Sequence, residues 1–210
     1  MKIAANFENE TRLWSGGIRL IAGVDEVGRG AWAGPVVAAA AVFPPFFKTS
    51  FKLFDSKLLS SKQREELAEK IKKTASVGIG VVGVPTINKI GIGRATQKAF
   101  REAVRSLPCD AEYFLIDAFY IRYWLRENQL PIKKGDRSCA SIAAASIVAK
   151  VYRDNLMRGL AGKYPQYGFD IHKGYGTSAH QEAIRQYKLS GVHRKSFNLS
   201  FLLTPLRVGH

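Results

Sequence analysis

Apolar residues gather along the chain in short runs that predict β-strands. Runs of strand length, bounded by glycine, proline or polar residues, occur at residues 18–25, 35–43, 76–84 and 112–117. A glycine-rich segment joins the first two runs, so we expect them to form an antiparallel hairpin. The last run is almost wholly apolar until it ends on Asp117, which is typical of a strand buried on both faces.

Polar segments with helical periodicity lie between these runs. Ser60 and Gln63 have the spacing of a capping box, which predicts a helix that begins near Ser61. A second helix is expected at about residues 93–107, where apolar positions recur at helical spacing. Pro108 stops that helix because proline cannot donate the next backbone hydrogen bond.

Two further helices are expected in the C-terminal half. Residues 139–160 are rich in alanine and serine, so neighbouring backbones can approach this helix closely. A polar loop follows, and a last long helix is predicted with Ser178 as its cap, Gln181 completing the capping box and Gly191 at its end. Strands that alternate with helices in this way predict an α/β fold with a mixed sheet.

Composition and charge narrow the class of protein. A chain of 210 residues with 46% hydrophobic residues is long enough to bury one substantial core, so we expect a single domain. Its 32 Lys and Arg against 17 Asp and Glu give a formal net charge of +15. Such a charge favours polyanionic partners, above all nucleic acid, although some small basic proteins bind none.

The sequence predicts a cytoplasmic protein that does not enter the membrane. Its beginning lacks the apolar stretch of a secretory signal. The longest uncharged stretch, residues 30–47, is cut by prolines to an apolar segment well short of the roughly 20 residues that a membrane span needs. Cys109 and Cys139 fit no metal-site spacing, so we expect free thiols in a reducing compartment.

Acidic residues stand at the positions where α/β proteins assemble their sites. Asp25 ends the first predicted strand and Asp117 ends a later one, while Asp154 lies on the helix predicted at 139–160. If the two strands are both central and parallel, Asp25 and Asp117 meet at one edge of the sheet, and a helix crossing that edge can add Asp154. Each acid alone would also fit an ordinary solvated side chain or a helix cap.

Glu26 follows Asp25 directly, and successive strand residues point to opposite faces. We therefore expect the strand to end or twist there, which Gly28 and Gly30 permit. A phosphate-binding loop is a weaker reading of this segment, because it lacks both the P-loop ending and the dinucleotide-binding glycine spacing. Clustered carboxylates in a basic protein instead predict a two-metal phosphodiester site with Mg²⁺ or Mn²⁺.

Ordered sequence blocks resemble the bacterial ribonuclease HII family. They are GVDEVGRG at 23–30, DSKLLS at 55–60, LID at 115–117, KGD at 134–136, SIAAASIVAKVYRD at 141–154, YPQYGFDIHKGYGT at 164–177 and HRKSF at 193–197. The match runs from about residue 20 to residue 197. The resemblance implies a ribonuclease H-like fold in a single catalytic domain, 1–210, with a core at about 18–160 and a C-terminal helical region at about 161–210.

The same resemblance implies an activity and its residues. The enzyme would hydrolyse the RNA strand of RNA:DNA hybrids and cleave 5′ to single ribonucleotides embedded in duplex DNA, leaving 3′-hydroxyl and 5′-phosphate ends. Two divalent ions, Mg²⁺ or Mn²⁺, would be held by four acids, Asp25, Glu26, Asp117 and Asp154. Backbone around the ribonucleotide would be contacted by Gly28, Arg29 and Gly30, and the deoxyribose after it by Tyr175.

For the remaining candidate residues, the sequence alone favours no single role. Lys134, Lys173 and Arg194 are candidate phosphate contacts, and each would equally fit a solvated surface charge. Without the resemblance, Tyr175 would fit a loop anchor. The histidines share no ligand spacing with the acids, so we expect no histidine metal site; they are His172, His180 and His193.

Two departures from the family pattern concern substrate contacts. Ala118 follows LID where the family usually has glycine, and Trp32 stands where a smaller residue is commoner. Two alternative functions also remain open. Another ribonuclease H-like nuclease, such as a junction resolvase, would use the same acids without preferring a ribonucleotide, and a noncatalytic hybrid-binding protein would use them structurally.

Overall fold

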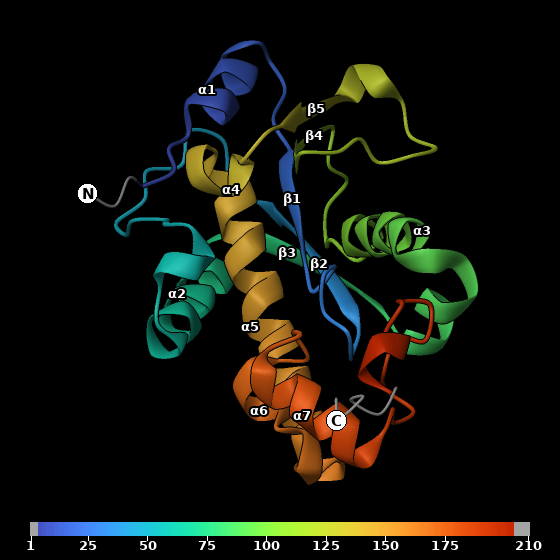
Figure 1. Cartoon of the computed structure of the whole chain (residues 1–210). Helices are drawn as coiled ribbons and strands as arrows, with labels where there is room; N and C mark the ends of the chain where they lie inside the picture. The colour runs from blue at the N-terminus through green and yellow to red at the C-terminus, as the bar shows by residue number, and fades with distance from the viewer. Residues whose placement is uncertain (1–3, 204–210) are drawn as a thin grey trace.

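A mixed β-sheet forms the centre of the molecule. The structure is a computed structural model that describes residues 4–203. The sheet has the order β3-β2-β1-β4-β5 (Figure 1). Its strands are β1 (Ile21–Val27), β2 (Val36–Val42), β3 (Ser76–Val82), β4 (Tyr113–Asp117) and β5 (Gln129–Ile132). β2 is antiparallel to both β1 and β3, whereas β4 is parallel to both β1 and β5, so the predicted hairpin and mixed sheet are confirmed.

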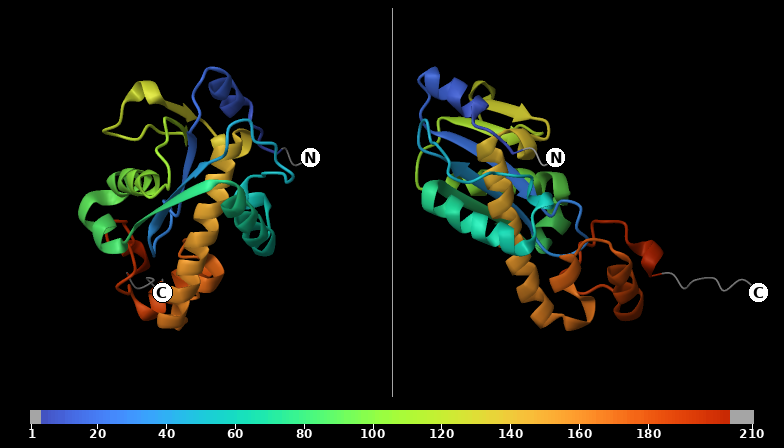
Figure 2. Two further views of the ribbon diagram at one scale, coloured as in Figure 1. Left: turned by 180° about the vertical axis from the view of Figure 1, so that it is seen from behind. Right: turned by 90° about the vertical axis from the view of Figure 1, so that its left-hand side faces the viewer.

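The side chains of β2 alternate between two hydrophobic cores. Its even-numbered residues pack with α3 (Val84–Arg105) on one face, and its odd-numbered residues pack with α2 (Ser61–Thr74) and α5 (Ala140–Lys163) on the other. The two further views show the same layers (Figure 2). Small residues bring α5 very close to the sheet, as its composition predicts: a Cβ added at Gly23 would overlap the backbone of Ser141.

The predicted capping box is present, but α3 is longer than its pattern predicts. Ser60 Oγ accepts a hydrogen bond from the Gln63 backbone N–H, and Gln63 Oε1 accepts one from the Ser60 backbone N–H. α3 begins at Val84 because a proline is well tolerated in the first turn of a helix. Gly91, with φ 77°, then kinks it, so the helix expected at residues 93–107 is its second half.

The sequence pattern does not predict the N-terminal helix α1 (Glu8–Ser15). This helix supplies a hydrogen-bond acceptor to the first turn of α5. Buried Glu10 accepts a hydrogen bond from the Ser141 backbone N–H at 2.8 Å. Residue 139, the N-cap of α5, makes no side-chain cap bond of its own, so an acid from a distant segment satisfies the first turn. A short helix, α4 (Gly135–Ser138), precedes α5.

The C-terminal segment packs against the far end of α5 (Figure 2). It contains α6 (Phe169–His172) and α7 (Ser178–Tyr187). The predicted cap of the last helix is wrong by one residue: the side chain of Thr177, not that of Ser178, accepts from the His180 N–H. α7 also ends before Gly191, because the backbone leaves helical geometry at Lys188.

Short 3₁₀ helices complete the secondary structure: η1 (Ser56–Leu58), η2 (Arg126–Asn128), η3 (Pro165–Tyr167) and η4 (Ser200–Leu202). No helix within residues 4–203 combines the length and the apolar composition that crossing a membrane requires.

Candidate active site

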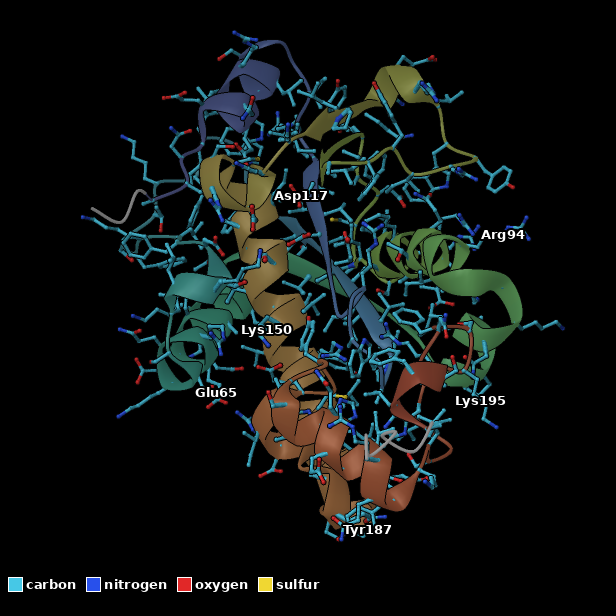
Figure 3. The ribbon with its side chains drawn as sticks, viewed as in Figure 1. Glu65, Arg94, Asp117, Lys150, Tyr187 and Lys195 are labelled. Atoms are coloured by element: carbon cyan, nitrogen blue, oxygen red, sulfur yellow. The ribbon has the colours of Figure 1, made fainter. Side chains whose placement is uncertain are left out.

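Two of the candidate acids stand next to each other at the carboxyl ends of neighbouring strands. Val24 of β1 is paired with Ile116 of β4 in a parallel ladder, and the next residues are Asp25 and Asp117. Both strands are internal to the sheet and parallel, so the condition under which Asp25 and Asp117 meet is fulfilled. Figure 3 shows Asp117 between α5, which carries Lys150, and α3, which carries Arg94.

The first strand does not end at Asp25 as the sequence suggests. Both Asp25 and Glu26 lie within β1, paired with Ala39 and Ala38 of β2. Continuous pairing to β2 keeps the strand regular, and the chain turns only at Gly28, where φ is 88°. The two carboxylates therefore leave the backbone on opposite faces.

Burial and mutual repulsion weaken the acidity of these residues. Asp25 is only 5% exposed, and burial raises its pKa well above the usual value, with the nearby charges of Glu26 and Asp117 raising it further. Burial also raises the pKa of Glu26, although Arg29 opposes that shift. For Asp117, burial raises the pKa while an N–H donated by Gly135 at 2.8 Å opposes it. Such a cluster gains stability from an added cation.

Asp154 differs from the other acids because protein cations already neutralise it. Lys150 Nζ lies 2.7 Å from one carboxylate oxygen, and Arg64 Nη2 lies 3.8 Å from the other. Lys150 and Asp154 share one face of α5, with Lys150 held by its partner although burial lowers its pKa. The carboxylate is 4% exposed and could bind a metal ion only by exchanging one of these partners.

The donor set fits a divalent cation. Glu26 Oε2 is buried and finds no hydrogen-bond partner among the described residues. Carboxylate oxygens are the ligands that Mg²⁺ and Mn²⁺ prefer. Asp25 and Asp117 supply such oxygens without an ion pair within residues 4–203, and Glu26 has only the 3.4 Å contact with Arg29. Within residues 4–203, however, no three acidic, histidine or cysteine side chains converge closely enough to hold a metal ion in this arrangement.

The DSK and KGD blocks lie beside the acids. Lys57 Nζ is 3.3 Å from Asp136 Oδ2, which ties η1 to α4. Ser56 Oγ and Ser146 Oγ are 3.2 Å apart, and Ser146 in turn opposes the rise in the pKa of Asp25. These contacts hold the loop before α2 against the acid cluster, a role that sequence spacing alone could not indicate.

The Gly-Arg-Gly turn rests on two buried arginines. An added Cβ at Gly28 would overlap the guanidinium of Arg153, whereas Gly30 faces open space. Arg153 is fully buried and donates hydrogen bonds to three backbone carbonyls, those of Ala33, Pro35 and Lys173. The turn and the loop after α6 are thus joined through one side chain.

Arg194 occupies a different place from the surface position expected of it. It is fully buried and donates to the carbonyls of Gly34 and Arg29, at 3.0 and 2.9 Å. Burial, together with the charge of Arg153, lowers its pKa to about 9. This placement leaves Arg194 no direct phosphate contact, because the guanidinium supports the turn from inside the protein.

The two candidate lysines lie nearer the surface. Lys134 is exposed in a left-handed conformation directly before Gly135, whose N–H binds Asp117. Lys173 is half-buried, also left-handed, and its ammonium donates to the carbonyl of Asp170.

Tyr175 is half-buried in the loop between α6 and α7. Its ring lies over the Arg153 guanidinium at 5.4 Å. Trp32 supports this loop, because its backbone N–H donates to Gly174 O at 2.8 Å and its indole fills the space where a Cβ at Gly176 would stand. The unusual tryptophan therefore contacts the two glycines on either side of the residue predicted to sense the substrate.

A chain of buried histidines holds the same loop. The Ser190 N–H donates to His193 Nδ1 at 2.9 Å, so the other nitrogen of His193 carries the proton and donates to His180 Nε2 at 3.0 Å. His180 Nδ1 then donates to the Tyr175 carbonyl at 3.0 Å. Every ring nitrogen in this chain has a partner when both histidines are neutral, and His193 Nδ1 also lies 2.8 Å from Ser190 Oγ.

Folding stability should decrease as the pH falls from about 6.5 towards 4. Burial lowers the pKa of His180 to about 4, helped by nearby His172, and burial lowers that of His193 to about 4 as well. The unfolded chain, with histidine pKa near 6.5, binds more protons in this interval, so the unfolding free energy rises with pH there. We expect His180→Gln to remove up to about one proton from this difference in proton binding, which lowers the pH dependence of the unfolding free energy by up to ~1.4 kcal/mol per pH unit.

Urea unfolding of the wild type and His180→Gln between pH 4.5 and 7 measures the difference. Contributions from carboxyl groups cancel in the comparison. Equal slopes for the two proteins would show that His180 is not held neutral.

A ribonuclease H-like nuclease is the class that this sheet order and this edge of buried acids define. The sequence profile of the ribonuclease HII family matches residues 22–200. Ribonuclease HII of Herpetosiphon aurantiacus is 46% identical over 198 residues, which cover 90% of this chain and 93% of that protein. The chain belongs to the ribonuclease HII family and is a hydrolytic endoribonuclease.

Solved structures share the fold. Ribonuclease HII from Archaeoglobus fulgidus, in its complex with PCNA, matches with a TM-score of 0.68 and 23% identity over 88% of this chain and 97% of that one. Bst-RNase HIII in complex with Mn²⁺ matches with a TM-score of 0.62 and 21% identity over 80% and 61% of the two chains. The predicted ribonuclease H-like fold is confirmed.

Proposed function

We propose that this enzyme hydrolyses the RNA strand of RNA:DNA hybrids and cleaves 5′ to single ribonucleotides in duplex DNA, leaving 3′-hydroxyl and 5′-phosphate ends. The observation that carries the proposal is the acid cluster at the carboxyl ends of β1 and β4, in which Asp25 is buried and Glu26 Oε2 has no hydrogen-bond partner among the described residues. It lies beside a turn and a loop that Arg153 joins. The cytoplasm is the compartment in which we place this activity.

Asp25, Glu26, Asp117 and Asp154 are the residues that we assign to two divalent ions. Mn²⁺ in the ribonuclease HIII structure supports the kind of ion, and either Mg²⁺ or Mn²⁺ suits oxygen ligands. When bound, such ions activate the attacking water and stabilise the leaving oxygen. Asp154 joins the set by releasing Lys150 or Arg64, and the released cation remains available to a phosphate.

The neighbouring residues bind and orient the strand. Gly30 presents its backbone to open space, so sugar and phosphate can approach it closely. Arg29 has a 42% exposed side chain that can reach the backbone around the ribonucleotide. Tyr175 offers a ring to the following deoxyribose, while Lys134 and Lys173 add positive charge along the strand. Groups at this turn distinguish RNA by its 2′-hydroxyl.

Cleavage of three matched duplexes tests the proposal. One is all DNA, one contains a single embedded ribonucleotide, and one is an RNA:DNA hybrid. We expect no cleavage of the first, one cut 5′ to the ribonucleotide in the second, and several cuts in the RNA strand of the third. Cutting of branched DNA without ribonucleotide preference would support a resolvase. Binding of the hybrid without any cutting, with Mg²⁺ and Mn²⁺ each supplied, would support a noncatalytic protein.

A further inference from the structure

A basic pocket lies next to the proposed active site. It has a volume of about 250 Å³ and is bounded by Arg29, by α3 and by the loop that follows β4. Its lining contains three arginines and no acidic residue; the lining residues are Arg29, Gly93, Arg94, Thr96, Gln97, Phe119 and Arg122. Arg29 Nη1 is also 3.4 Å from Glu26 Oε1, so the pocket begins where the acid cluster ends.

The positive charge of this pocket is not neutralised by the protein. Within residues 4–203, the guanidinium groups of Arg94 and Arg122 have no ion-pair partner. Arg29 has only the long contact with Glu26 and lies over the Phe119 ring, 4.7 Å from its centroid. Arginines that converge without a carboxylate attract an anion of matching geometry, such as a phosphate.

Backbone contacts fix the walls of the pocket. Gln97 Nε2 donates to the Tyr120 carbonyl at 2.9 Å, and Gln97 Oε1 accepts from the Arg122 N–H at 2.8 Å. One side chain of α3 thereby clamps the loop that carries Phe119 and Arg122. The arginines are consequently presented from held backbone segments, which favours binding because less ordering is needed.

The kink in α3 adds to the positive potential. Gly91 is not helical, so the helix starts again after it, and Gly93 and Arg94 belong to the new first turn. The N–H groups of a first turn lack partners within the helix and favour an anion. Here they coincide with two residues that line the pocket.

We propose that this pocket binds one backbone phosphate of the substrate duplex, outside the scissile bond, through Arg94 and Arg122. The inference rests on the proposed function, because it takes nucleic acid as the ligand. Charge complementarity favours that occupant, and the 39% exposed ring of Phe119 offers an apolar wall to the adjoining sugar. Arg29 then faces the scissile region on one side and this phosphate on the other.

Binding measurements on an Arg94→Gln/Arg122→Gln variant test the pocket. We use an Asp25→Asn background to prevent cleavage and follow the anisotropy of a labelled duplex that carries one ribonucleotide. Loss of a charge-assisted contact should weaken binding roughly tenfold, and loss of one phosphate should reduce the log-log salt slope by roughly 0.9. Arg12→Gln is the matched control on α1, at the other end of β1 (Figure 1), and should keep the slope.

A scan of neutral phosphates locates the contact. Methylphosphonates replace the backbone phosphates one at a time, and we expect one position outside the scissile bond to weaken binding to the Asp25→Asn protein but not to the double arginine variant. The Arg94→Lys/Arg122→Lys variant keeps both positive charges, so the methylphosphonate at that position should still weaken its binding in part. Identical scan profiles for the arginine variant and its parent would overturn the inference.

The same proteins separate the two proposals. With Asp25 restored, wild-type cleavage at the ribonucleotide together with identical scan profiles would reject only the pocket. If one methylphosphonate position weakens binding to the parent protein but not to the double arginine variant, and the wild type cleaves nothing, only the proposed reaction is rejected.

Discussion

Asp25→Asn should abolish cleavage of a ribonucleotide-containing duplex, and Asp117→Asn should do the same. An amide cannot supply the carboxylate charge that holds a divalent ion, so both the metal and its activated water are lost. Binding of the uncleaved duplex should stay the same or improve, because one negative charge near the phosphate is removed. Cleavage and anisotropy assays on the same preparations measure both results.

Stability should respond in the opposite direction to activity. Burial raises the pKa of Asp25, which means that an ionised carboxylate at this position destabilises the folded protein. Asp25→Asn removes that charge and should leave the melting temperature unchanged or higher. Asp110→Asn is a matched control, because Asp110 is exposed before the start of β4. Near-normal cleavage by both Asp25→Asn and Asp117→Asn, in Mg²⁺ and in Mn²⁺, would contradict the metal assignment.

Local patterns predicted much of the sheet and part of the acid cluster. An apolar run that ends on an acid places the acid at the rim of the core, and strand adjacency then brings Asp25 beside Asp117. The Ser60 capping box needs only residues close in sequence, so the start of α2 was predictable. Strand β1 runs past Asp25 because its pairing with β2 continues, which the acidic pattern of residues 25–26 does not indicate.

Other elements depend on partners distant in sequence. β5 is a four-residue edge strand that contains Pro131, so neither its length nor its composition predicts a strand, and its pairing with β4 defines it. α1 is another such case, since its buried Glu10 is explained only by the backbone of Ser141. Sequence patterns of one segment carry no information about such contacts.

The buried arginines were the main omission at the site. Arginine is mostly exposed in proteins, so the sequence indicates no structural role for Arg153 and favours a surface position for Arg194. Both become buried because carbonyls from several separate segments converge on their guanidinium groups. Through these hydrogen bonds, the two arginines hold the Gly-Arg-Gly turn and the Tyr175 loop in place.

Tyr175→Ala should sharply reduce cleavage at a single embedded ribonucleotide, on the order of tenfold to a hundredfold, because the ring no longer supports the sugar beside the cut. Tyr175→Phe keeps the ring over Arg153 and should retain much of the activity. The main-chain contacts of the loop do not depend on the ring: His180 binds the Tyr175 carbonyl, and the Trp32 backbone binds Gly174. The loop should therefore keep its shape in both variants.

Parallel assays on a single-ribonucleotide duplex and a long hybrid distinguish sensing from anchoring. A metal-activated water has no intrinsic preference for the first ribonucleotide, so a sensor of the junction should affect the single-ribonucleotide duplex more than the hybrid. Tyr187→Ala is the control, since Tyr187 is an exposed tyrosine at the far end of α7 (Figure 3). If Tyr175→Ala instead lowers the melting temperature while activity per folded molecule is unchanged, the ring only anchors its loop, and selectivity must come from the Gly-Arg-Gly turn.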